Sequence, residues 1–176
     1  MHGLIFASFR DYLVSEHGED AASEVLAGEP LYSLGEAYAD EQFLELLERA
    51  CGRTGLSRDE ILFEFGVFTA ATTFARLYSV VFKASSTARD FLLTVEEPIH
   101  DVIRVVLPDA RPPELAMTDL GQDGLEIVYT SPRRICAMLR GLVEGTGRVY
   151  DETLQVEELE CMHQGAAACR LLVRFA

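Results

Sequence analysis

Apolar residues recur every three or four positions through residues 1–107, a spacing that places them along one face of a helix. In the first such stretch, Ile5, Phe9 and Tyr12 share a face. The pattern as a whole predicts helices over residues 3–16, 19–26, 40–51, 57–78 and 91–107.

Polar residues near the starts of these helices support the predicted boundaries. Asp40 can cap the third helix, whose apolar face includes Leu44. Ser57 and Glu60 form a capping box for the fourth helix. Pro98 lies inside the fifth helix, where it lacks a backbone donor and should kink the helix or restart it just before His100.

After residue 113 the helical spacing gives way to alternation, which is typical of strands. Ser131 and Pro132 interrupt the alternation and predict a helix start, as cap and first helical position. Helices first and antiparallel strands last predict an α+β fold, in which an N-terminal helical part precedes helices packed on a C-terminal antiparallel sheet. The predicted strands cover residues 115–118, 125–130, 154–162 and 168–175.

The composition narrows the class of protein. The chain has 176 residues, 49% hydrophobic and 25% charged, so we expect one globular domain over residues 1–176. Its net charge of −14 repels nucleic acid and anionic membrane surfaces, so neither is an expected partner. The sequence opens without a basic, apolar leader and has no apolar run of about 18 residues. With four cysteines expected as reduced thiols, it is predicted to be cytoplasmic.

Three polar residues, Tyr129, Ser131 and Arg133, occupy alternate positions and are called the 129–133 motif below. Two hydroxyls and a guanidinium fork are donors suited to carboxylates. The motif could instead be a strand end that runs into a helix cap, with Ser131 as the cap. Both roles are compatible, since a serine oxygen can accept from a backbone N–H while its proton is donated elsewhere.

One of the four histidines has an apolar setting. His2 is near the start, His17 is in a polar stretch and His163 is in a predicted hairpin turn, whereas His100 borders the apolar face of a helix. A lone histidine there can simply be a hydrogen-bonded or surface residue. Combined with the 129–133 motif, it indicates haem b, with the imidazole on iron and the motif on the propionates.

Several motifs spread over nearly the whole chain carry a family resemblance. They are residues 1–5, 36–40, Gly66, 97–100, 111–113, 129–133 and 141–145. On these motifs the sequence resembles the haem-nitric-oxide/oxygen-binding (H-NOX) domains, which also occur in soluble guanylate cyclase. The resemblance implies that His100 is the iron ligand, that the 129–133 motif binds the propionates, and that Pro113 and Ile5 pack against the macrocycle.

The resemblance also suggests which gas is sensed. In oxygen-binding members a tyrosine in the helix after the signature donates to dioxygen, and the matching residue here is Met138. Phe9, Thr69 and Ala70 are the other expected gas-side residues, and Thr69 is only a weak donor. We therefore expect a sensor of nitric oxide and carbon monoxide with little or no oxygen binding. The expected partner is a separate histidine kinase or diguanylate cyclase.

The cysteines suggest a second metal. Cys161 and Cys169 flank Gly165, and Cys136 matches a third thiol that some bacterial relatives use with this pair to bind zinc. Glu158 stands at the usual fourth position, and His163 could replace it. The thiols could equally be three buried apolar side chains, or a thiol and zinc redox switch in the same fold, with haem absent or secondary. Catalytic motifs such as Gly-x-Ser-x-Gly are absent from the sequence, so we expect no enzyme.

Overall fold

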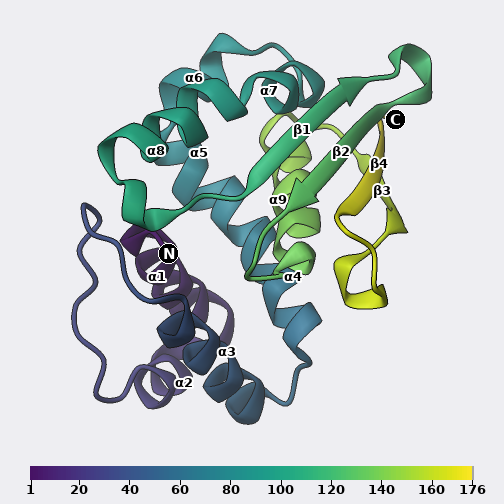
Figure 1. Ribbon diagram of the computed structural model, residues 1–176. Coiled ribbons are helices and arrows are strands. Elements are labelled where there is room, and N and C mark those ends of the chain that lie inside the picture. The colour runs from purple at the N-terminus through teal and green to yellow at the C-terminus, as the bar shows by residue number, and fades with distance from the viewer. Residues whose placement is uncertain (176) are drawn as a thin grey trace.

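Helices form most of the first two thirds of the protein, and a four-stranded antiparallel sheet dominates the rest (Figure 1). The computed structural model describes residues 1–175, without the side chains of residues 97 and 98. The predicted α+β fold is therefore confirmed. The helices are α1 (Gly3–Tyr12), α2 (Gly18–Val25), α3 (Asp40–Thr54), α4 (Arg58–Phe68), α5 (Ala75–Leu77), α6 (Ser79–Ala84), α7 (Ala88–Thr94), α8 (Val102–Val106) and α9 (Cys136–Val149).

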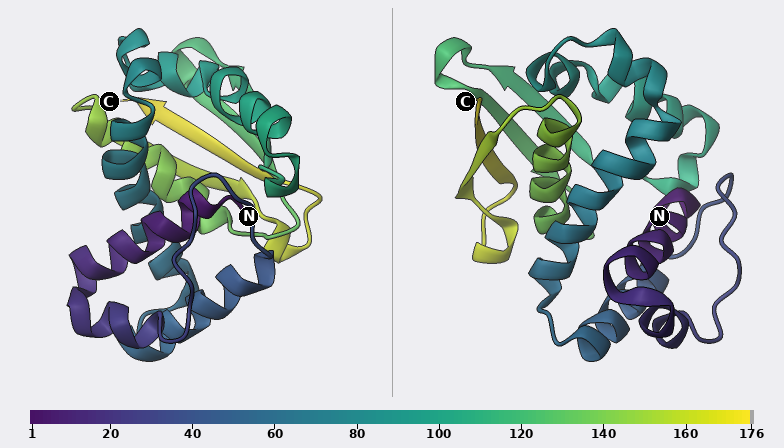
Figure 2. Two further views of the ribbon diagram at one scale, coloured as in Figure 1. Left: turned by 90° about the vertical axis from the view of Figure 1, so that its left-hand side faces the viewer. Right: turned by 180° about the vertical axis from the view of Figure 1, so that it is seen from behind.

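The sheet has the strand order β1-β2-β4-β3, and every neighbouring pair is antiparallel. Its strands are β1 (Glu114–Asp119), β2 (Leu125–Thr130), β3 (Leu154–Glu160) and β4 (Cys169–Phe175). Alternate residues of β2 and β4 are buried, as the alternating sequence predicted. Helix α9 lies against this sheet and separates it from α4 (Figures 1 and 2).

Three π-helical turns interrupt the predicted helices at Leu13–His17, Thr69–Phe74 and Glu96–Asp101. The second and third turns continue the helical path between two α-helical segments, whereas the first is followed by Gly18, whose φ of 85° breaks the path at the start of α2. The predicted kink or restart at Pro98 depends on its side chain, which lies outside the described part of the structure. The backbone around it nevertheless departs from regular α-helix, and such π turns are frequent at functional sites.

The predicted cap of α4 is confirmed, and the predicted cap of α3 is wrong. Ser57 Oγ accepts from Glu60 N, and Glu60 Oε2 accepts from Ser57 N at 2.8 Å. Asp40 is instead the first residue of α3, after Ala39 at the cap position. Its carboxylate is used in a long-range contact described below. The buried face of α3 also differs from the prediction, because Leu46 is fully buried and Leu44 is only half-buried.

The predicted helix start at Ser131 is also wrong, because α9 begins at Cys136. Ser131 Oγ accepts from Arg133 N at 3.3 Å, and the Ser131 carbonyl accepts from Arg134 N at 3.2 Å. These bonds close a tight turn. Arg134 then takes a left-handed backbone conformation with φ of 50°, which cannot continue a right-handed helix. The 129–133 motif therefore lies on a strand end and on the turn that leads into α9.

Two hydrophobic cores meet at α9. The N-terminal core is rich in aromatic side chains, and Phe9 packs edge-on against Phe43 and Phe65 there. The second core lies between the sheet, α9 and the helices α6 and α7, where Phe82 stacks on Phe91. Residues of α9 belong to both cores, so this helix fixes how the two halves of the molecule are placed.

Helices α4 and α9 touch backbone to backbone. A Cβ atom on Gly141 would lie 2.0 Å from the Phe63 carbonyl oxygen, and one on Gly66 would lie 2.3 Å from the Met138 carbonyl oxygen. Neither helix can approach this closely with a larger residue at these positions. The glycines therefore set the distance between the two helices.

Candidate functional site

A largely apolar cavity lies between the N-terminal helices and the rest of the molecule. It encloses about 870 Å³ of space free of protein atoms, part of it open to solvent. Its walls come from α1, the α5–α6 region, the His100 segment, the loop before β1, β2 and α9. The wall residues are Met1, His2, Leu4, Ile5, Phe74, Tyr78, Ile99, His100, Ile103, Ala110, Pro112, Pro113, Leu115, Tyr129, Ser131, Arg133, Ile135, Met138, Leu139 and Leu142.

The structure brings most of the predicted site residues to this one cavity. They are Ile5, His100, Pro113, Tyr129, Ser131, Arg133 and Met138. Two predicted residues are placed elsewhere. Phe9 points into the N-terminal aromatic core, and the buried Thr69 hydroxyl lies 3.0 Å from Ser8 Oγ. Neither is part of the described cavity wall, so neither can contact a ligand there without rearrangement.

His100 belongs to the cavity wall, and one of its two ring nitrogens is hydrogen-bonded within the protein. Its Nδ1 lies 2.6 Å from Glu96 Oε2. A carboxylate can only accept, so Nδ1 carries the proton, and in the neutral imidazole Nε2 then carries the free electron pair. Nε2 has no hydrogen-bond partner among the described residues, and the side chain is 17% exposed. This is the arrangement that a metal-binding histidine requires.

Tyr129 and Ser131 supply hydroxyls to the cavity wall. Tyr129 is at the end of β2 and is 2% exposed, and this burial raises its pKa to about 12. The phenol therefore stays protonated at neutral pH and can donate. Ser131 Oγ accepts from the Arg133 backbone N–H at 3.3 Å, and a hydrogen bond from its side chain opposes the rise in the pKa of Tyr129.

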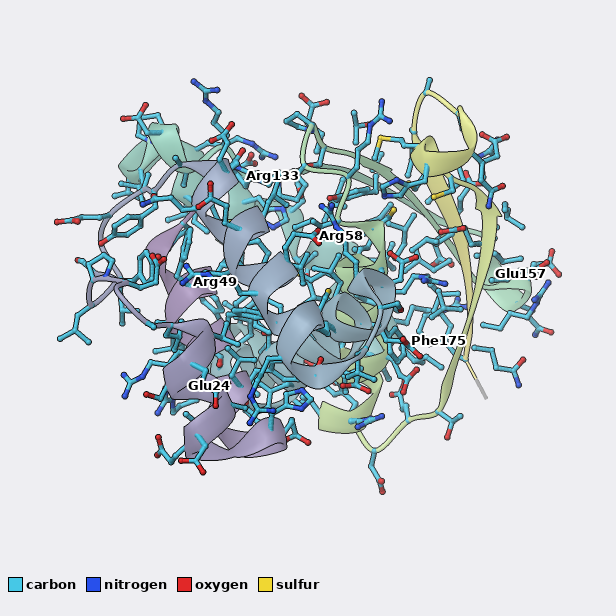
Figure 3. The ribbon with its side chains drawn as sticks, turned by 90° about the horizontal axis from the view of Figure 1, so that it is seen from below. Glu24, Arg49, Arg58, Arg133, Glu157 and Phe175 are labelled. Carbon is cyan, nitrogen blue, oxygen red and sulfur yellow. The ribbon has the colours of Figure 1, made fainter. Side chains whose placement is uncertain are left out.

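Arg133 is more strongly bound within the protein than the sequence suggested. Its Nε donates to Asp40 Oδ1 at 2.7 Å, Nη1 donates to the Arg111 carbonyl at 2.5 Å, and Nη2 donates to the Ala110 carbonyl at 2.8 Å. A guanidinium has five N–H donors, so two remain for a ligand. In Figure 3 Arg133 lies close to the N-terminal helices, far from Glu157 and Phe175 on the strands.

Asp40 is the anionic partner of this arginine. Burial alone would raise the pKa of Asp40, but hydrogen bonds from the Met1 amino group and Arg133 outweigh it and hold the pKa below its ordinary value. The carboxyl therefore remains ionised at neutral pH. It joins α3 to the turn that carries the 129–133 motif, two segments that are 93 residues apart in sequence.

These residues fit haem b. A flat aromatic macrocycle needs apolar walls, its iron needs a neutral imidazole nitrogen, and its propionates need donors. The cavity combines apolar walls with His100 Nε2 and with the hydroxyls of Tyr129 and Ser131. The partial use of Arg133 by Asp40 is a departure from a motif devoted wholly to propionates.

Three thiols form a separate cluster near the start of α9. The Sγ atoms of Cys136, Cys161 and Cys169 all lie within 4.8 Å of one another, and all three residues are buried. Burial raises the pKa of the Cys136 and Cys169 thiols. Among the described residues neither Glu158 nor His163 joins this group, and His163 Nε2 instead lies 2.7 Å from the Arg134 carbonyl oxygen.

Sequence reasoning missed several residues around the cavity. Glu96 and Arg104 flank His100 at intervals of four residues, and this helical spacing could have indicated their contact. Tyr78 and Phe74 border the cavity from the end of a long predicted helix, where no pattern distinguished them from core residues. Nothing local signalled the pairing of Asp40 with Arg133.

A protein-family model described as Haem-NO-binding matches residues 2–158, most of the chain. The chain belongs to the haem-NO-binding, or H-NOX, family. This membership agrees with the cavity, since the model's match covers His100 and the 129–133 motif.

Solved H-NOX structures share the fold of this domain. One is an H-NOX protein from S. oneidensis in the Fe(II)NO state, with 22% identity and a TM-score of 0.91 over 100% of this chain and 99% of that chain. Another is the unliganded Fe(II) H-NOX protein from K. algicida, with 19% identity and a TM-score of 0.85 over 100% and 97%. No curated protein matches the chain. Among the described residues, no helix has the length and apolar character needed to cross a membrane.

Proposed function

We propose that this H-NOX domain binds haem b through His100 and senses nitric oxide and carbon monoxide. The observation that carries the proposal is the free Nε2 of His100 on an apolar cavity whose wall also holds the 129–133 motif. Membership of the haem-NO-binding family supports it. The related S. oneidensis structures include Fe(II)NO and Fe(II)CO states, and their fold supports the same use of this cavity.

In this proposal, different residues of the cavity wall hold different parts of the haem. His100 holds the iron, and Tyr129 and Ser131 donate to the propionates, with Arg133 contributing its two remaining N–H groups. Pro113 and Ile5 pack against the ring and limit how it can lie. When bound, ferrous haem would supply an iron atom that takes a diatomic gas and thereby weakens its bond to the imidazole.

The α1 and α9 walls of the cavity favour nitric oxide and carbon monoxide over oxygen. Bound dioxygen gains stability from a hydrogen-bond donor, whereas the other two gases do not need one. On the α1 and α9 walls, Ile5, Met138 and Leu142 offer only carbon and sulfur. The hydroxyl of Thr69 is engaged with Ser8 away from the cavity. The cavity-lining residues Ile5, Met138 and Leu142 of these two helices therefore offer no hydrogen-bond donor to bound oxygen.

The absorption spectrum of the purified, reduced protein tests this function. We expect a Soret band that does not change in air and that shifts on addition of nitric oxide or carbon monoxide. A colourless protein that cannot be reconstituted with hemin would refute haem binding itself. A spectrum that changes reversibly in air would refute only the gas selectivity.

We propose that the signal is passed to another protein by a change of conformation, without catalysis by this domain. The His100 segment, the 129–133 motif and α1 meet at the cavity, so release of His100 would free the N-terminal helices to move relative to the sheet. A histidine kinase or diguanylate cyclase with a basic patch would suit the net charge of −14. A single cytoplasmic domain is part of the same proposal.

We also propose that the thiol cluster of Cys136, Cys161 and Cys169 binds zinc. Three buried thiols within 4.8 Å can supply three of the four ligands of a tetrahedral zinc site. Glu158 or His163 would complete the site after a local shift. Because burial favours the protonated thiols, zinc binding must release protons and should weaken as the pH falls.

Metal analysis of zinc-supplied protein is expected to give one zinc per chain, and Cys161→Ser should reduce it by at least about tenfold. Cys51→Ser is the matched control, because Cys51 lies in α3 outside the cluster. Zinc content that Cys161→Ser leaves unchanged would contradict the site. A loss in only one of Glu158→Gln and His163→Ala would identify the fourth ligand.

A further inference from the structure

His100 has a charged partner on its own helical segment. Its Nδ1–H donates to Glu96 Oε2 at 2.6 Å, four residues earlier in the chain. Arg104, four residues later, donates from Nη2 to the other carboxylate oxygen, Glu96 Oε1, also at 2.6 Å. Glu96 is thus shared between an imidazole and a guanidinium, with one oxygen for each.

Arg104 also connects this segment to the loop before β1. Its Nη2 donates to the Pro113 carbonyl at 2.9 Å, and its Nη1 donates to Asp101 Oδ1 at 2.6 Å. Both His100 and Pro113 belong to the cavity wall. A chain of hydrogen bonds therefore runs from one wall residue, through Glu96 and Arg104, to another.

The chemistry of such a chain acts on the free nitrogen of His100. A carboxylate that accepts the Nδ1 proton leaves more negative charge on the ring, so Nε2 becomes a stronger electron donor to a metal. Hydrogen bonds to an ionised acceptor are roughly twice as strong as neutral ones. Arg104 draws charge toward the opposite oxygen of Glu96 and so weakens it as an acceptor. The two residues therefore influence Nε2 in opposite directions.

The side chains are sheltered enough for this influence to persist in water. His100 is 17% exposed, Glu96 is 27% exposed and Arg104 is 34% exposed. Screening by solvent and salt is weaker for partly buried pairs than for pairs on the open surface. The ion pair of Glu144 with Arg148 on α9 offers a contrast, because both of its side chains are more exposed.

We propose that Glu96 and Arg104 are positioning residues that set the strength of the bond between His100 and haem iron, Glu96 strengthening it and Arg104 moderating it. This inference rests on the proposed haem function. In a sensor that works through loss of that bond, the pair determines how readily His100 is released, although neither residue belongs to the cavity wall. It also links the release to Pro113, through the bond from Arg104 to its carbonyl.

Two substitutions with opposite expected effects test the proposal. Glu96→Gln keeps a neutral acceptor near Nδ1, so the iron–histidine stretching frequency in resonance Raman spectra should shift down and the reduction potential should rise. Arg104→Gln removes the guanidinium that competes for Glu96, so the carboxylate becomes a stronger acceptor for the His100 proton. The iron–histidine frequency should therefore shift up and the reduction potential should fall. The five-coordinate fraction of the nitric oxide complex should increase in the first variant and decrease in the second.

Glu144→Gln is the matched control, since it also converts a carboxylate that pairs with an arginine, here Arg148 on α9. It should leave frequency, potential and coordination number unchanged. If the substitutions only loosened the packing, the iron–histidine frequency would shift in the same direction in both variants. That result would overturn the proposal, and so would an unchanged frequency in both. If Glu96→Gln does not fold, Arg104→Gln decides alone, and the absence of its upward frequency shift overturns the proposal. Wild-type protein that takes up no haem would instead refute the proposed function.

Discussion

Replacing His100 by glycine is expected to remove haem from the purified protein, with a loss of affinity of more than about 100-fold. Loss of an outer-shell partner of a metal ligand already costs about 10–100-fold, and His100 is the ligand itself in our proposal. The apolar cavity and the 129–133 motif would remain intact. Added imidazole should therefore occupy the vacated space and restore the Soret band.

His163→Gly is the control for this experiment. His163 is exposed, and its contact is with the Arg134 carbonyl, outside the cavity wall. This variant should retain haem at the wild-type level. Normal haem retention by His100→Gly without imidazole would show that another residue holds the iron. A spectrum that imidazole cannot restore in a folded variant would show that the cavity is not preformed.

Gly141→Ala is expected to destabilise the fold by more than about 3 kcal/mol. Overfilling a packed core commonly costs about 1–3 kcal/mol, and the atoms in the way here are backbone atoms that cannot rotate aside. The new methyl carbon would lie 2.0 Å from the Phe63 carbonyl oxygen and 2.9 Å from Val67 N. This steric clash can therefore be relieved only if α4 and α9 move apart. For a chain of this length, thermal denaturation should show a fall in Tm of roughly 6–12 °C or more.

Gly52→Ala makes the same substitution where space is open. Gly52 lies in α3, and an added Cβ would meet no heavy atom within 4 Å. Alanine has a helix propensity about 1 kcal/mol better than glycine, so this variant should be slightly more stable than wild type. If Gly141→Ala were within about 1 kcal/mol of Gly52→Ala, the close contact of α4 and α9 would not be a constraint on the fold.

The parts of the structure that local patterns determine were predictable. Apolar spacing predicted the helices around Phe43 and Ile61 and the alternating burial of β2, because one face of each element must leave water. The capping box of Ser57 and Glu60 was confirmed because both partners lie within one helical turn. Family motifs, spread over the whole chain, indicated His100 and the 129–133 motif together.

The parts that depend on distant contacts or on backbone exceptions could not be predicted from local patterns. Ser131 and Pro132 suit a helix start, but the left-handed backbone at Arg134 delays α9 to Cys136. Asp40 suits a helix cap, but its carboxylate bonds Arg133 across 93 residues. Phe9 lies on the predicted apolar face of α1, yet periodicity could not tell whether that face met a cavity or a core.

The sharing of Arg133 between Asp40 and a ligand has a thermodynamic consequence. Asp40 belongs to α3, whereas Ala110 and Arg111, which also accept from Arg133, precede the sheet. A carboxylate ligand that draws the guanidinium toward itself competes with Asp40 and loosens the attachment of α3. Linkage is reciprocal, so a partner protein that displaces α3 must alter the affinity of the cavity for that ligand by the same factor.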